Sequence, residues 1–166
     1  IHHHPYAWQP QPMHPNPNQG KKALRKGRHS QTNGIYFITT ATHQRIPWFQ
    51  QFDLASIMSR CMLDPKCFPD ARNLCWVVMP DHVHVLVQLG ETPLSEVVRR
   101  LKANSALLLN RDIGRKGRFW DAAFHDHGLR KEESVRGIAR YIVGNPLRAG
   151  LVTNLGDYPY WHAIWL

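Results

Sequence analysis

The chain has 166 residues and a mass of 19.2 kDa, the size of one domain with a tail, so we expect no second catalytic domain. A formal charge of +9 and a pI near 9.9 favour a polyanionic partner, most simply nucleic acid, although a basic ribosomal or membrane-surface protein has the same balance. Apolar runs stay shorter than the roughly 18 residues of a membrane-spanning helix and no secretory leader is apparent, so we expect a cytoplasmic protein.

The first 30 residues differ in composition from the rest. They are rich in Pro, His, Gln and Asn without a periodic apolar pattern, which predicts a flexible arm. Met13 is a candidate natural start, which would make residues 1–12, with His2 to His4, foreign to the native protein. The arm ends in a basic run that either grips a phosphate backbone or is a solvated leader: Lys21, Lys22, Arg25, Lys26, Arg28 and His29.

The pattern becomes typical of a globular protein from Gly34. We predict one catalytic domain over residues 31–152, followed by a tail over 153–166. The run GIYFITTATH predicts a first strand, and residues 53–62 predict a helix. NLCWVVMP and HVHVLVQL predict two strands of a hairpin, joined where Pro80 cannot donate a ladder hydrogen bond.

The second half of the domain alternates helix and strand again. Residues 93–110 predict an amphipathic helix with a cationic face, and FWDAAFHDH predicts a fourth strand. A last helix begins near Glu132 and ends where Pro146 interrupts it. The order βαββαβα predicts an α+β fold of the ferredoxin-like class, with an antiparallel sheet, helices on one face, and an added helix after the fourth strand.

Two histidines alternate in one predicted strand. The period-2 spacing of His82 and His84 directs both imidazoles to the same sheet face, which is half of a metal site. A pair of ordinary core or surface histidines would show the same spacing. His125 and His127 alternate too, and form a rival metal pair with Asp126 or Asp121 nearby. Asp81 is predicted as a turn residue, with orientation of a histidine or a metal contact as alternatives.

Tyr141 and Asn145 stand four residues apart on the predicted last helix and therefore share its face. Taken alone, Tyr141 would be a core residue and Asn145 a helix-ending residue. Taken with the histidine pair, they suggest tyrosine-dependent, metal-assisted cleavage of a DNA strand. The cysteines Cys61, Cys67 and Cys75 are odd in number and lack CxxC spacing, which predicts reduced, mostly buried thiols.

Several segments appear together in a familiar order: YFITTATHQR, VVMPDHVHVLV, RRLKAN, GRFWDAAFHDHGLR and YIVGNPLRAGLV. On these segments, from about Gly34 to Val152, the chain resembles the REP-associated tyrosine transposases of the HUH single-strand endonuclease superfamily. The resemblance implies that His82 and His84 bind a divalent metal, Mg²⁺ or Mn²⁺, with Asn145, and that Tyr141 is the nucleophile. Gly144 stands where some members have a second tyrosine, and the tail DYPYWHAIWL departs from the family ending.

The resemblance also implies the reaction and its substrate. Tyr141 would attack a phosphodiester of hairpin-forming repetitive palindromic DNA and leave a 5′-phosphotyrosine link with a free 3′-hydroxyl. A tyrosine hydroxyl has a reference pKa of about 10, so the metal or a basic group must favour phenolate character. We expect single-stranded or hairpin DNA of the bacterial nucleoid as partner, and a monomer, with a dimer that exchanges tyrosine helices as the alternative.

Other residues are weaker candidates for contact with DNA. Phosphate contacts are predicted, against a merely solvated role, for Arg99, Arg100, Lys102, Arg115, Lys116 and Arg118. Trp161 and Trp165 could stack on unpaired bases, whereas Trp120 is predicted in the core. Two other functions fit parts of the pattern: a non-catalytic binder of single-stranded nucleic acid, and a metal-dependent hydrolase that uses water. The chain is shorter than a barrel hydrolase of typically 250 residues.

Overall fold

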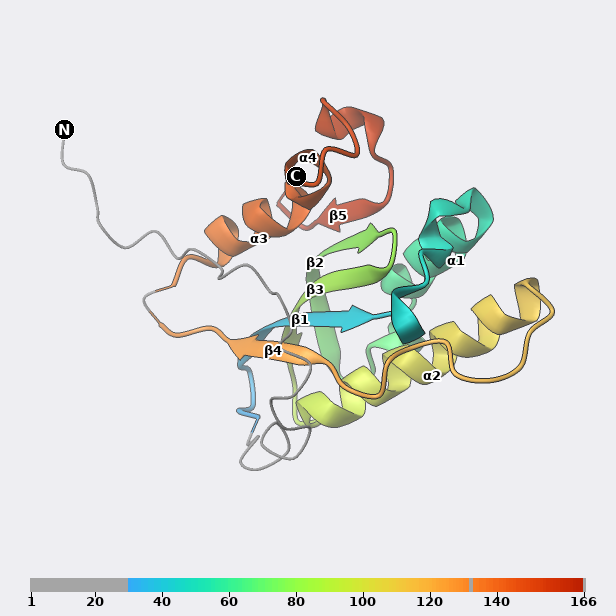
Figure 1. Cartoon of the computed structure of the whole chain (residues 1–166). Coiled ribbons are helices and arrows are strands. Elements are labelled where there is room, and N and C mark those ends of the chain that lie inside the picture. Colours follow the sequence, from blue (N-terminus) through green and yellow to red (C-terminus); the bar gives the residue numbers. More distant parts are fainter. Residues whose placement is uncertain (1–29, 132, 166) are drawn as a thin grey trace, which may run out of the picture.

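The computed structural model describes residues 30–131 and 133–165, and a five-stranded antiparallel sheet lies at its centre (Figure 1). Residues 1–29 of the predicted arm, including Lys22, Arg25, Lys26 and Arg28, fall outside the described residues. The strands follow the order β4-β1-β3-β2-β5 across the sheet. Their bounds are β1 Ile35–Ala41, β2 Ala71–Met79, β3 His82–Leu89, β4 His125–Gly128 and β5 Trp161–Ala163.

Helices cover both faces of the sheet. The helices α1, Phe52–Leu63, and α2, Leu94–Asp112, pack on one side, and α3, Val135–Val143, packs on the other and continues into α4, Asn145–Arg148 (Figure 1). Single 3₁₀ turns lie at His43–Arg45, Trp48–Gln50, Pro65–Cys67 and Leu155–Asp157. Within the described part of the chain, every helix is too short or too polar to cross a bilayer. The predicted α+β fold is confirmed, with the added helix on the face opposite α1 and α2.

Alternation along the strands decides which residues face which layer. In β3, Val83 and Val85 are buried in the cluster that includes α1 and α2, whereas Leu86 is buried in the cluster that includes α3. Successive side chains of a strand point to opposite faces, so His82 and His84 lie on the α3 side with Leu86. The alternation that buries Val83 and Val85 on the side of α1 and α2 therefore places His82 and His84 on the side that α3 covers.

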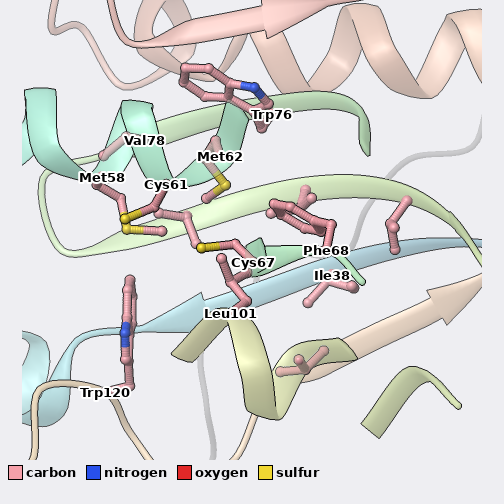
Figure 2. Packing of buried hydrophobic residues seen from close by; sticks show 14 of the residues in the cluster. Ile38, Met58, Cys61, Met62, Cys67, Phe68, Trp76, Val78, Leu101 and Trp120 are labelled. Atoms are coloured by element: carbon pink, nitrogen blue, oxygen red, sulfur yellow. The ribbon is translucent and has the colours of Figure 1, made fainter. Parts of the chain in front are cut away.

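The larger core lies between the sheet and α1 and α2. Figure 2 shows the sulfur atoms of Cys61 and Cys67 among Met58, Met62 and Leu101. All three cysteines are free and buried, as predicted; Cys75 lies in the other cluster, on the α3 side, where burial raises the pKa of its thiol to about 12. Burying a leucine or valine side chain contributes about 1.5–3 kcal/mol, so the larger core carries much of the stability.

Trp120 belongs to this core, as predicted. Its side chain is buried, and its indole N–H donates to the hydroxyl of Ser105 on α2 at 3.0 Å. The bond satisfies a polar group that burial would otherwise leave without a partner.

The predicted β2–β3 hairpin is confirmed, and its two-residue turn is braced from outside. The backbone N–H and the hydroxyl of Thr42 both donate to the carbonyl of Asp81, at 2.9 and 3.0 Å. The N–H of Phe49 donates to the carbonyl of Pro80 at 3.0 Å. These bonds fix the turn that leads directly into His82.

The fourth strand is shorter than the predicted 119–127. Only His125–Gly128 pairs with β1, and Trp120 forms an isolated bridge with Thr42. Between them, the Lys102 ammonium donates to the carbonyls of Asp121 and Ala123, at 2.9 and 2.8 Å. A side chain of α2 thus satisfies backbone groups that the prediction assigned to strand pairing.

The last predicted helix and the tail also differ from expectation. Helix α3 ends at Val143, and Pro146 lies inside the first turn of α4, where its missing N–H costs no helical hydrogen bond. Residues Trp161–Ala163, in the predicted tail, form β5 and pair with Cys75, Trp76 and Val77 of β2. The tail therefore completes the edge of the sheet, and Trp161 lies in that edge strand.

Candidate functional site

His82 and His84 form the centre of the candidate site. Their ring centroids lie 4.7 Å apart with the rings nearly perpendicular. His82 Nδ1 lies 2.6 Å from Asp81 Oδ1, and His84 Nδ1 lies 2.8 Å from the hydroxyl oxygen of Thr39 on β1. Since each Nδ1 has a partner, Nε2 is the ring nitrogen left for a ligand on both residues. Such partners fix the orientation of a metal-binding imidazole.

The surroundings of the pair favour neutral imidazoles. Burial lowers the pKa of His84 well below its ordinary value, and the charges of His82, Arg148 and Arg45 act in the same direction. Burial also lowers the pKa of His82, against the opposing effect of the Asp81 carboxylate. Neutral imidazole is the form that coordinates metals, so the lowered pKa values suit a metal-binding role for this pair.

Asp81 combines two of the roles considered for it. It occupies the β2–β3 turn, and its carboxylate also joins His82 to Arg45, whose Nη1 lies 3.3 Å from Asp81 Oδ2. The carboxylate therefore orients one histidine and holds an arginine beside the pair. Arg45 follows β1 in the sequence, and it was not identified as a site residue from the pattern alone.

Helix α3 places Tyr141 on the same side of the sheet. The Ser134 hydroxyl caps this helix by accepting from the N–H of Gly137 at 3.0 Å, and Ile138 and Ile142 bury its apolar face. The Tyr141 ring meets the Phe37 ring edge-on, with centroids 6.4 Å apart, and Phe37 in turn lies 5.3 Å from the His84 ring. The structure thus brings Tyr141 and the histidine pair together around Phe37.

Asn145 lies at the junction of α3 and α4. Its amide nitrogen donates to the carbonyls of Ile142 and Tyr141, at 3.0 and 3.3 Å. The predicted relation to Tyr141, one helical turn earlier, is kept across the helix boundary. Because the amide nitrogen is engaged by the end of α3, the amide oxygen Oδ1 is the group that Asn145 can offer to a ligand.

Most of the predicted phosphate-contacting cations lie elsewhere. Arg99 and Arg100 pair with Glu96 on α2, at 2.7 and 2.8 Å, on the opposite side of the sheet from α3. Lys102 is used by the backbone of residues 121–123. The Arg115 guanidinium lies 5.5 Å from the centre of the Trp48 ring, and Lys116 and Arg118 are exposed. The α2 cations are therefore not brought to the histidine pair.

The rival histidine pair has other partners. His127 Nε2 lies 2.9 Å from a carboxylate oxygen of Glu133, and Asp121 contacts His43 at 3.3 Å. His125 pairs in register with Thr39, so the rival pair shares the sheet face of His84. Across the residues that the structure describes, no group of three or more His, Cys, Asp or Glu side chains is arranged to hold a metal ion.

Comparison with solved structures defines the class of fold. The chain matches a structure of a REP-associated tyrosine transposase bound to a REP hairpin, with a TM-score of 0.66, 23% identity, and coverage of 81% of this chain and 79% of that one. It also matches the crystal structure of a candidate transposase from Deinococcus radiodurans, with a TM-score of 0.52 and 20% identity over 73% of this chain and 96% of that one. The fold is that of the tyrosine transposases.

Sequence comparison then gives the family. Residues 30–145 match the model of the IS200-like transposases, so the chain belongs to that family of transposase-type DNA-binding proteins. A protein of Haemophilus influenzae assigned by name to the REP-associated tyrosine transposases is 26% identical over 139 residues, 76% of this chain and 78% of that protein. The REP-associated tyrosine transposase of Escherichia coli is 30% identical over 87 residues, about half of each chain.

Proposed function

We propose that the protein is a metal-dependent single-strand DNA endonuclease and strand transferase, with Tyr141 as its nucleophile. The observation that carries this proposal is the arrangement around Phe37. There, a tyrosine on α3 and His84 on β3 contact the same phenylalanine ring, and His84 contacts His82, with the Nδ1 atom of each histidine engaged and burial favouring neutral imidazoles. Because one chain supplies all three side chains, the arrangement favours a monomer.

The donor groups fit a divalent cation. His82 and His84 would each offer Nε2, and Asn145 would offer its amide oxygen, a set of two nitrogens and one oxygen that suits Mg²⁺ or Mn²⁺ shared with water and phosphate. When bound, such a cation supplies Lewis-acid polarisation of a phosphate oxygen. Asp81 and Thr39 would hold the two rings in place, and Arg45 would add positive charge for an anionic substrate.

The reaction is a transesterification. The Tyr141 hydroxyl oxygen would form a bond to phosphorus while the bond from phosphorus to the 3′-oxygen breaks. The phenol loses its proton, the departing 3′-oxygen gains one, and the 5′-phosphate stays linked to tyrosine. One phosphodiester replaces another, so the step is reversible without ATP, and rejoining can use the same site.

For the substrate, we propose single-stranded or hairpin DNA formed by repetitive palindromes. The support is the related protein whose structure was determined with a REP hairpin, together with the net charge of +9 of this chain. A hairpin presents both duplex phosphates and an adjoining single strand. The tyrosine would act on that strand.

The test is adduct formation with labelled single-stranded hairpins from intergenic palindromes of the source genome. Wild type and Tyr141→Phe are each incubated with Mg²⁺, Mn²⁺ or EDTA, then denatured and separated by electrophoresis. We expect a metal-dependent protein–DNA band in wild type only. Hairpin binding without an adduct would support a non-catalytic binding module instead. Cleavage that persists in Tyr141→Phe would indicate a water nucleophile.

A further inference from the structure

We infer that Arg148 is a positioning residue for Tyr141, and that Gly144 leaves the space that the arginine guanidinium occupies. This inference deepens the proposed function and rests on Tyr141 as the nucleophile. Arg148 comes from the last residue of α4, seven positions after Tyr141. Its part in the site appears only once α3 and α4 are folded against each other.

Arg148 makes two contacts with the same residue. Its guanidinium carbon lies 3.9 Å from the centre of the Tyr141 ring, within the range of a close cation–π contact. Its Nη2 also donates to the backbone carbonyl of Tyr141. One planar group therefore covers the ring face and holds the backbone of the residue that carries the ring.

Phe37 provides a further contact of the Tyr141 ring. The two rings meet at an interplanar angle of 75°, so an aromatic ring from β1 and a guanidinium from α4 both contact the tyrosine. A nucleophile must be held near its attack geometry, because small displacements reduce the rate strongly. Phe37 is part of β1 and of the sheet. Of the two contacts with Tyr141, the one made by Arg148 is therefore better suited to a test by substitution.

Gly144 explains how the arginine reaches the ring. A Cβ atom at this position would lie 2.9 Å from Arg148 Nη1 and 3.1 Å from the carbonyl oxygen of Arg140. The backbone of Gly144, with φ −77° and ψ −2°, is in the right-handed helical region that alanine also adopts. An alanine here would therefore crowd the guanidinium and make it shift from its present position, whereas the backbone conformation does not demand glycine.

The two contacts of Arg148 depend on the shape of the guanidinium as well as on its charge. Lysine carries the same charge but lacks the planar fork that stacks and donates at once.

The experiment compares Arg148→Ala, Arg148→Lys and Gly144→Ala with Arg136→Ala, which removes an exposed arginine from α3. Single-turnover adduct formation and hairpin affinity are measured for each. We expect Arg148→Ala and Gly144→Ala to slow adduct formation roughly tenfold, the size of a lost cation–π contact, with hairpin affinity within about twofold of wild type. Arg148→Lys should recover part of the rate, and Arg136→Ala should match wild type.

A second measurement does not depend on activity. The protein is labelled with 3-fluorotyrosine, and the Tyr141 resonance among the five tyrosines is assigned from Tyr141→Phe. The fluorine chemical shift of Tyr141 should change in Arg148→Ala and in Gly144→Ala, and it should stay at its wild-type value in Arg136→Ala. An unchanged shift in both variants would overturn the inference, as would a rate loss matched by an equal loss of hairpin affinity. A wild type without any adduct would refute the proposed function, while the fluorine shifts would still decide the positioning.

Discussion

The hydroxyl of Thr39 and the imidazole of His84 are joined by a buried hydrogen bond of 2.8 Å between neighbouring strands. Because the two residues are directly opposed in the β1–β3 register, the sheet itself sets which ring nitrogen of His84 is engaged. Thr39→Val keeps the shape of the side chain and removes this bond. We expect a loss of about 10–100-fold in Mn²⁺ affinity, as for other partners of metal-binding histidines, measured by calorimetry.

The adjacent residue offers a matched control. Among the residues that the structure describes, the buried Thr40 hydroxyl has no hydrogen-bond partner, so Thr40→Val removes a polar group without breaking a hydrogen bond. This variant should leave Mn²⁺ affinity unchanged and unfold at the same or a higher urea concentration. Equal loss of Mn²⁺ affinity in both valine variants would contradict the role given to Thr39.

Stability should depend on pH through Lys102. Burial, partly offset by Asp121, lowers the pKa of its ammonium to about 8 in the folded state, against about 10.4 in the unfolded chain. Between these values the unfolded state binds more protons, so the contribution of Lys102 to stability rises as pH increases from 8 to 10. The gain is about 1–3 kcal/mol after allowance for partial exposure.

Urea unfolding of wild type and Lys102→Met at pH 7.5 and 9.5 measures this effect. The stability difference between the two proteins should grow in favour of wild type at the higher pH. The cysteines and other titrating groups are common to both proteins, so their effects cancel. A difference that is the same at both pH values would show that Lys102 titrates normally.

Glu133 holds the connection between β4 and α3. Its carboxylate lies 2.9 Å from His127 Nε2 and accepts the N–H of Arg130 at 2.7 Å. Glu133→Ala should cost about 1 kcal/mol, the typical net value of such bonds, and increase amide exchange at the start of α3. Lys131→Ala, an exposed change in the same connection, is the control. Unaltered exchange in Glu133→Ala would exclude an anchoring role.

Helix α2 provides a buried and an exposed leucine for a test of the core. Leu101 is 1% exposed and Leu107 is 70% exposed. Leu101→Ala should lower the free energy of unfolding by about 2–5 kcal/mol, because it removes contacts and leaves a cavity. Leu107→Ala should change it by less than about 0.5 kcal/mol. Similar losses in urea unfolding would mean that α2 packs differently from the structure.

The sequence by itself determined the hairpin that carries His82 and His84, the helices at α1 and α2, the buried cysteines and Trp120. These features follow from local periodicity and turn residues, which act over a few positions of the chain. The pairing of Tyr141 with Asn145 also follows from helical spacing. The family resemblance rests on such local segments, and the family is confirmed.

Only the tertiary structure decided which distant groups meet at the site. Thr39 and Phe37 reach His84 through strand register, Arg45 is joined to His82 through Asp81, and Arg148 reaches Tyr141 across Gly144. The pairing of β5 with β2, and the use of Lys102 in place of strand bonds, were likewise hidden from local pattern. Register and packing depend on contacts between residues far apart in the chain, which periodicity does not encode.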